Sequence, residues 1–207
     1  MAKHSIKAVL LDYGGVIADE GLQNGLRALS HEQGLDVDTM MNVARSAVYD
    51  SGFVLGWGTE AEFWQRMREG SGLQGSDTEL TKRILEGFVL RDWMIKRVQQ
   101  FSSRGIITGI LSDQMHWLDW LNERDQFFGF FDHVFNSYYM GKGKRDPGLF
   151  YDIAEQLALS PGEILLVDDI KSNVQRAQAA GWQTIHYVDK AGFLDRIDRI
   201  IPSDKPE

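Results

Sequence analysis

Four short runs of apolar residues recur along the chain, and each ends beside a polar residue or a turn. The first run covers residues 6–12 and stops at the turn sequence Tyr13-Gly14-Gly15. The other three cover residues 106–112, 163–169 and 183–188, and each follows a stretch with helical character. Short apolar strands that alternate with helices are typical of a parallel sheet covered on both faces. The pattern therefore predicts an α/β fold with a parallel sheet flanked by helices.

The segment between the first two runs has a different pattern. It contains several helix signals in succession, and we see no convincing strand in it. Ser76 has the position of a helix N-cap with Glu79 at the capping-box position, and Thr59-Glu60-Ala61-Glu62 opens another expected helix. The pattern predicts that this segment is a helical insert.

The length of the chain limits how these parts are divided. A chain of 207 residues is long enough for one well-buried domain and a smaller appendage. Its composition of 43% hydrophobic and 25% charged residues is that of a folded globular protein. We therefore predict a Rossmann-like core formed by residues 1–18 and 92–207, with a helical cap at residues 19–91.

Composition and charge exclude several classes of function. The chain has no cysteine, which excludes disulfides and thiolate metal sites and favours a cytoplasmic location. No apolar stretch near the N-terminus approaches the roughly 20 residues of a membrane span, so we expect no membrane partner. A formal net charge of -8 disfavours nucleic acid and anionic membranes. An anionic substrate would therefore require a local cluster of cations or a metal ion.

Carboxylates follow three of the apolar runs. Asp12 ends the first run, Ser112-Asp113 ends the second, and Asp168-Asp169 ends a later one. A single Asp after a strand is often only a turn or helix-cap residue. Parallel sheets, however, bind ligands beyond the carboxyl ends of their strands, and carboxylates that converge there repel one another unless a cation neutralises them. The three segments together predict a site for Mg²⁺, a hard cation that suits oxygen ligands and phosphate.

The chain resembles the haloacid-dehalogenase-like hydrolase superfamily through four segments that occur in order. These segments are Leu10-Leu11-Asp12-Tyr13-Gly14-Gly15-Val16, Leu111-Ser112-Asp113, Lys144-Arg145-Asp146-Pro147 and Val167-Asp168-Asp169-Ile170-Lys171-Ser172-Asn173. The resemblance covers nearly the whole chain, with the insert in the place of the family's helical cap. It implies a Mg²⁺-dependent phosphatase that hydrolyses a small phosphorylated metabolite, such as a sugar phosphate.

The resemblance also implies a role for each matching residue. Asp12 would attack phosphorus and form an aspartyl-phosphate. Ser112 would hydrogen-bond a phosphate oxygen, and Asp113 would belong to the substrate pocket while shaping its turn. Lys144 would neutralise the nucleophile and the phosphoryl oxygens, with Lys142 as a rival for that role. Alternatively, Lys142, Lys144 and Arg145 form a solvated basic loop.

The same resemblance implies a set of metal ligands. Mg²⁺ would bind Asp12, the backbone carbonyl of Gly14, and Asp169 as the principal acidic ligand. Asp168 would be a second or water-mediated ligand, and Asn173 would orient the pair.

One position departs from the family pattern. Family phosphatases carry a second Asp, the general acid and base, two residues after the nucleophile, where this chain has Gly14. The rate should then depend strongly on the leaving group, unless Asp19 or Glu20 supplies the proton. The alternative for these two residues is that they are exposed charges at the hinge of the cap. A similar Asp-x-Gly-x-Val opening occurs in a bacterial branch that includes phosphatases of anomeric sugar phosphates, whose leaving groups need less help.

Other functions remain open at the level of sequence. The chain could be a non-catalytic family member that keeps a metal or phosphate pocket, or a phosphotransferase resembling the mutases. A 2-haloacid dehalogenase fits less well, because those relatives lack the paired acids seen as Asp168-Asp169. Arg45, Tyr49, Trp57 and Trp64 in the insert are conceivable substrate contacts or, equally, residues of its core. The sequence indicates neither the substrate nor the oligomeric state.

Overall fold

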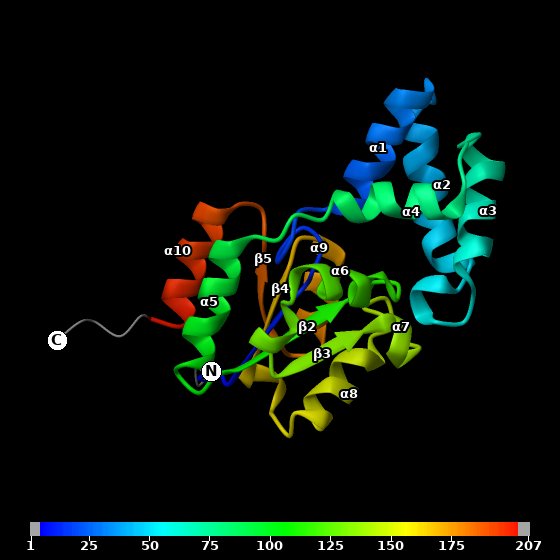
Figure 1. Ribbon diagram of the computed structural model, residues 1–207. Helices are drawn as coiled ribbons and strands as arrows, with labels where there is room; N and C mark the ends of the chain where they lie inside the picture. The colour runs from blue at the N-terminus through cyan, green and yellow to red at the C-terminus, as the bar shows by residue number, and fades with distance from the viewer. Residues whose placement is uncertain (1–4, 203–207) are drawn as a thin grey trace.

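The computed structural model describes residues 5–202, and its centre is a five-stranded parallel sheet (Figure 1). The strands are β1 (Ala8–Leu11), β2 (Ile107–Ser112), β3 (His133–Asn136), β4 (Ile164–Asp168) and β5 (Gln183–His186). Their order is β3-β2-β1-β4-β5, and every pair is parallel. The predicted α/β class is confirmed, and β1 lies in the middle with its carboxyl end between those of β2 and β4.

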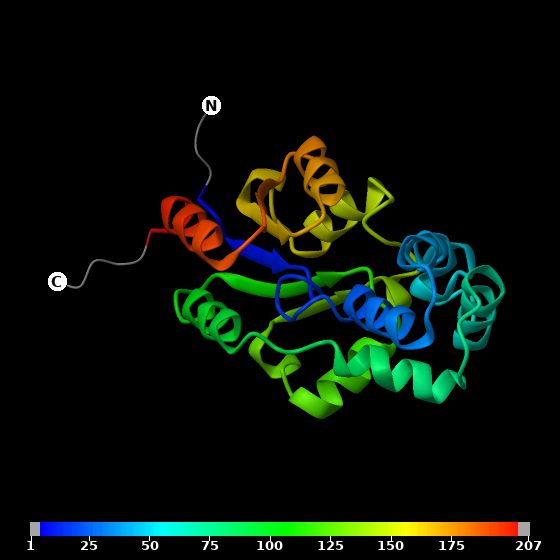
Figure 2. The same cartoon turned by 90° about the horizontal axis from the view of Figure 1, so that it is seen from above.

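Both faces of the sheet are covered by helices (Figure 2). One face packs against α5 (Asp92–Ser102), α6 (Trp117–Asp125) and α10 (Lys190–Ile200), and the other against α8 (Gly148–Gln156) and α9 (Lys171–Ala179). Along β1, Val9 and Leu11 join the first of these two cores, while Ala8 and Leu10 join the second. All four are completely buried. This is why the strand reads as a continuous apolar run, and burial of each larger side chain contributes about 1.5–3 kcal/mol.

Four helices lie between β1 and α5, beyond the carboxyl ends of the strands (Figure 1). They are α1 (Gly21–Gln33), α2 (Val37–Asp50), α3 (Glu60–Ser71) and α4 (Asp77–Glu86), with the short helix η1 (Phe53–Leu55) between α2 and α3. We call them the helical insert. The capping boxes at Thr59 and Ser76 are present and confirm two predicted helix starts. The division into core and cap stays a prediction, and residues 1–4 and 203–207 of that core lie outside the described residues.

Strand β3 corrects the sequence analysis, which expected four strands. The segment His133-Val134-Phe135-Asn136 is not a continuous apolar run, because β3 lies at the edge of the sheet and pairs only with β2. Val134 is 37% exposed, whereas Phe135 is buried. Three short helical elements complete the connections. They are η2 (Phe128–Phe130), α7 (Ser137–Met140) and η3 (Pro161–Glu163).

The two chain segments that link the sheet to the helical insert lie side by side. The Asp19 amide donates to the Val89 carbonyl at 2.9 Å, and the Arg91 amide donates to the Ile17 carbonyl at 2.9 Å. The Arg91 guanidinium also binds the Gly15 carbonyl at 2.6 Å and the Asp19 carboxylate at 3.0 Å. These contacts fix the loop that follows β1. Within residues 5–202, no helix combines the length and the apolar character that crossing a bilayer requires.

Candidate active site

Asp12 lies directly after the central strand, and its carboxylate is held by residues from two other segments. Its backbone amide donates to the Val167 carbonyl of β4 at 2.9 Å, which extends the sheet by one residue. The Ser112 hydroxyl donates to Oδ1 of Asp12 at 2.7 Å, and Nζ of Lys144 lies 2.8 Å from Oδ2. Ser112, at the end of β2, and Lys144, in the loop after α7, are both buried. The structure thus places two of the predicted residues, Ser112 and Lys144, against the carboxylate of a third, Asp12.

Lys144, and not its rival Lys142, reaches the site. Nζ of Lys144 is completely buried and donates to Oδ2 of Asp168 at 2.6 Å as well as pairing with Asp12. Burial alone would lower the pKa of Lys144, but the two carboxylates raise it above its usual value, so the side chain stays charged. Lys142 points elsewhere and pairs with Asp152 at 2.6 Å. The sequence favours Lys144 only through its family-like position two residues before Asp146, whereas the contacts in the structure distinguish the two lysines directly.

Asp168 is fully buried, and both of its oxygens already accept hydrogen bonds. Oδ1 accepts from the Ile170 amide at 2.8 Å, and the Asn173 side-chain amide lies 3.2 Å from Oδ1 and 3.3 Å from Oδ2. Asn173 therefore contacts Asp168, one of the two acids that it was expected to orient. The neighbouring Asp169 is half-buried and makes its described hydrogen bond through the backbone carbonyl, to His186 at 2.9 Å.

The three carboxylates form a group that fits a hard cation. One oxygen each of Asp12, Asp168 and Asp169 lies within 4.8 Å of the others. Three carboxylates against the single ammonium of Lys144 leave a formal charge of two negatives in a buried place. Burial raises the pKa of Asp12 to about 7, opposed by Lys144 and assisted by the two other carboxylates. Burial and Asp168 likewise raise the pKa of Asp169. A divalent cation would relieve this repulsion, so the residues fit Mg²⁺.

The turn after Asp12 needs glycine at one of its two glycine positions. Gly15 has φ of 79°, and a Cβ there would collide with the Asp169 carboxylate. Gly14 has no positive φ, and a Cβ on it would lie 3.4 Å from Cε1 of Phe88 and 3.7 Å from Oε1 of Glu20. Gly14 therefore has room for a side chain, whereas Gly15 allows Asp169 to approach the turn.

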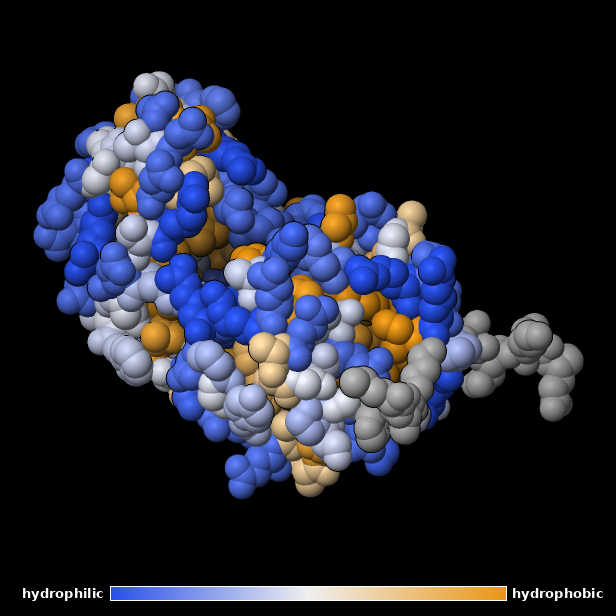
Figure 3. Space-filling view, turned by 180° about the vertical axis from the view of Figure 1, so that it is seen from behind, coloured by the Kyte–Doolittle hydropathy of each residue, from blue (hydrophilic) through white to orange (hydrophobic). Residues whose placement is uncertain are grey.

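A cavity of about 710 Å³ opens above these residues, between the strand ends and helices α1 and α2. Figure 3 shows this face of the molecule hollowed between the helical insert and the rest. The wall formed by α1 and α2 is partly apolar, with Leu22, Leu26 and Met41. Four arginines also line the cavity, although the chain as a whole is acidic. They are Arg27, Arg45, Arg145 and Arg176.

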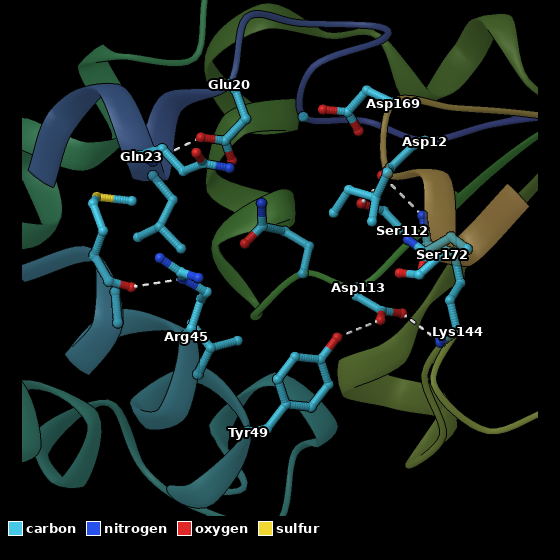
Figure 4. A pocket seen from close by; sticks show the side chains of 18 of the residues that line it. Asp12, Glu20, Gln23, Arg45, Tyr49, Ser112, Asp113, Lys144, Asp169 and Ser172 are labelled. Atoms are coloured by element: carbon cyan, nitrogen blue, oxygen red, sulfur yellow. Dashed lines mark hydrogen bonds and ion pairs between the residues drawn. The ribbon is translucent and has the colours of Figure 1, made fainter. Parts of the chain in front are cut away.

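Tyr49 connects the helical insert to the strand ends. Its hydroxyl donates to Oδ2 of Asp113 at 2.7 Å, and Oδ1 of Asp113 accepts from the Lys144 amide at 2.8 Å (Figure 4). The Arg145 guanidinium lies 3.3 Å from the centre of the Tyr49 ring. From the sequence, Tyr49 is only a conceivable substrate contact. The side chain of Asp113 therefore links Tyr49 to the segment that carries Lys144.

The aromatic residues of the insert divide between core and surface. Trp64 is completely buried and stacks on Trp117 with ring centres 5.9 Å apart. Trp57 is 75% exposed, and neither tryptophan of the insert lines the cavity. Of the four conceivable contacts, only Arg45 and Tyr49 do.

Comparison with known proteins agrees with this architecture. A family model described as haloacid dehalogenase-like hydrolase matches residues 6–181. Enolase-phosphatase E1 of Yersinia enterocolitica is 38% identical over 63 residues, which cover 30% of this chain and 24% of the relative. The matched segments make up 9% to 24% of the length of four curated relatives that the chain matches.

Two solved structures illustrate the likeness of fold. A HAD family enzyme of Bacteroides thetaiotaomicron, solved with magnesium and inorganic phosphate, has a TM-score of 0.65 at 22% identity, covering 91% of this chain and 96% of that one. L-2-haloacid dehalogenase from Xanthobacter autotrophicus, solved with chloropropionic acid covalently bound, has a TM-score of 0.63 at 17% identity, covering 96% and 85%. At these identities the similarity establishes the fold alone.

Proposed function

The chain belongs to the haloacid dehalogenase-like hydrolases, and on that premise we propose that it is a Mg²⁺-dependent phosphatase acting on a small phosphorylated metabolite. The observation that carries this proposal is the environment of Asp12. Its carboxylate is buried at the end of the central strand, with a hydroxyl at 2.7 Å, an ammonium at 2.8 Å and two further carboxylates beside it. This arrangement suits a nucleophile that receives a phosphoryl group.

In the proposed reaction, Asp12 attacks phosphorus and the bond to the leaving oxygen breaks, so that an aspartyl-phosphate forms. Water then hydrolyses this intermediate and regenerates the Asp12 carboxylate. Ser112 donates a hydrogen bond to a phosphoryl oxygen once the substrate displaces it from Asp12. Lys144 holds the nucleophile in place and neutralises charge on the phosphoryl group, because its ammonium is buried and fixed by Asp168.

The metal ligands would be Asp12, the Gly14 carbonyl and Asp169, with Asp168 as a second or water-mediated ligand. A bound Mg²⁺ would supply positive charge that neutralises the three carboxylates and the phosphoryl oxygens. Magnesium in the Bacteroides thetaiotaomicron structure is consistent with this assignment. Both oxygens of Asp168 accept hydrogen bonds from this chain, which favours a water-mediated contact of Asp168 with the metal.

The cavity indicates which substrates to test first. Its four arginines, beside five carboxyls, offer binding partners for the anionic groups of a substrate, and its volume of about 710 Å³ admits a metabolite of modest size. The helical insert would close over it and exclude water, with the hydrogen bond from Tyr49 to Asp113 as one of the contacts between the two parts. We propose no nucleic-acid or membrane partner, because the net charge of -8 disfavours both.

A phosphatase screen tests the proposal directly. Purified protein should release inorganic phosphate from members of a panel of small phosphorylated metabolites with Mg²⁺ present, and release should stop with a chelator. Asp12→Asn, which keeps the size of the side chain, should abolish release while circular dichroism and Tm stay close to those of the wild type. Halide release from 2-haloacids without metal, and no phosphate release, would instead identify a dehalogenase. Activity toward neither class would indicate a non-catalytic binding protein.

A further inference from the structure

The proposed phosphatase reaction needs a proton donor, and the cavity offers few free carboxyls. An alkoxide is a poor leaving group, so a positioned acid accelerates its departure by about 10²–10⁴. The carboxyls on the cavity wall are those of Asp12, Glu20, Asp38, Asp113 and Asp169. Asp12 and Asp169 belong to the nucleophile and metal group, and Asp113 is bound to Tyr49 and to the Lys144 amide. Asp38 is exposed on the far wall, on α2.

Glu20 is the remaining carboxyl, and it is held beside the nucleophile loop. Its Oε2 accepts a hydrogen bond from the Gln23 amide at 2.7 Å, which caps α1 and fixes the side chain. No residue in the range 5–202 donates a hydrogen bond to the other oxygen, Oε1, which would lie 3.7 Å from a Cβ on Gly14. Figure 4 shows the side chain projecting into the cavity that also contains Asp12 and Ser112. Oε2 therefore holds the side chain in place, and Oε1 faces the cavity.

We propose that Glu20 is the general acid and base of this site. From the start of α1, its carboxyl reaches the space that a side chain at position 14 would occupy. The inference rests on the proposed phosphatase function. In the first step a bond forms between an Asp12 oxygen and phosphorus, the bond from phosphorus to the leaving oxygen breaks, and that oxygen takes the proton of Glu20. In the second step Glu20 removes a proton from the attacking water as phosphate departs. One water is consumed per ester cleaved, and both carboxyls return to their starting states.

The electrostatic surroundings of Glu20 are compatible with this task. Burial raises the pKa of Glu20 to about 7, although the hydrogen bond from the Gln23 amide acts in the opposite direction. The Asp169 carboxylate assists burial in raising this pKa, and the Arg27 guanidinium opposes it. A carboxyl that is half protonated near neutrality can both give and accept a proton, which an acid-base catalyst must do in successive steps.

Asp19, the neighbouring alternative, is engaged elsewhere. Its carboxylate pairs with the Arg91 guanidinium at 3.0 Å, on the linking segments of the insert. Asp19 does not line the cavity. It therefore provides a matched control that differs from Glu20 by one position in sequence and by its surroundings.

The experiment compares Glu20→Gln with Asp19→Asn on two substrates, an alkyl phosphate that the wild type hydrolyses and 4-nitrophenyl phosphate. Glutamine keeps the size of the side chain and an oxygen for the Gln23 amide, so the cap of α1 should survive. We expect Glu20→Gln to lower kcat/KM on the alkyl phosphate by about 10²–10⁴ and on 4-nitrophenyl phosphate by less than about tenfold, because nitrophenolate leaves unprotonated. Asp19→Asn should change both substrates by the same factor.

A rescue variant separates chemistry from folding. Gly14→Asp in the Glu20→Gln background should restore most of the alkyl-phosphate activity, because position 14 has room for a side chain. Equal losses on both substrates in Glu20→Gln, or no loss on the alkyl phosphate, would overturn the assignment of Glu20 and leave the phosphatase function intact. Absence of phosphate release by the wild type would overturn the proposed function, and the assignment of Glu20 with it.

Discussion

Replacing Lys144 by methionine would test whether the buried ammonium holds the site together. The substitution keeps the length of the side chain nearly unchanged and removes only its charge. Lys144 is completely buried between Asp12 at 2.8 Å and Asp168 at 2.6 Å. Removal of one partner from a buried ion pair leaves the other charge uncompensated and costs about 3–5 kcal/mol.

The size of the effect on melting follows from the length of the chain. For proteins of this size, each kcal/mol lowers Tm by about 2–4 °C. Lys144→Met should therefore lower Tm by roughly 6–20 °C, measured by calorimetry or circular dichroism without divalent ions. Added Mg²⁺ should raise Tm more in the variant than in the wild type, because the three carboxylates no longer have their ammonium.

Lys142→Met is the matched control. Lys142 lies in the same loop, two residues away, and pairs with Asp152 at the surface, where ion pairs contribute little. Its removal should leave Tm and phosphate release close to the wild type. If the two variants melt at the same temperature, the buried ammonium of Lys144 does not hold the site together.

Three further results are expected. Gly15→Ala should abolish activity and Gly34→Ala should keep it, because only the Cβ at position 15 meets the Asp169 carboxylate. Both glycines have positive φ, so both variants should lose about 1–2 kcal/mol of stability. Asp169→Asn should raise the Mg²⁺ concentration needed for half-maximal phosphate release, whereas Asp195→Asn on the surface of α10 should not. If both variants need the same Mg²⁺ concentration, Asp169 is not a metal ligand. The pKa of Glu20 is about 7, and an acid must be protonated to act. The kcat/KM for an alkyl phosphate should therefore fall as pH rises through 7, relative to that of Glu20→Gln, whose side chain does not titrate. Identical pH profiles of the two proteins would contradict this assignment.

Several features of the molecule were predictable because their causes are local. The run 6–12 is buried on both faces of a parallel sheet, and such strands are continuously apolar. Thr59 and Ser76 start helices through hydrogen bonds to residues three positions away. Carboxylates at the ends of strands meet because parallel strands end at one edge of the sheet. The α/β fold and the group of Asp12, Asp168 and Asp169 follow from these patterns.

The remaining features depend on contacts between distant segments. Strand β3 escaped prediction because an edge strand is only partly buried and shows no clear apolar run. The sequence places Asp19 beside Glu20 with nothing to distinguish them, but Arg91, 72 residues further along, binds the first and leaves the second facing the cavity. For Lys144 and Lys142 the sequence offers only a preference from position, and the contacts of Lys144 with Asp12 and Asp168 are what distinguish it from Lys142. The types of residue and their spacing in the sequence thus determined which chemical groups the chain carries to the site. Tertiary packing decided which of two similar neighbouring residues is buried there, and burial fixes the charge and the partner of that residue.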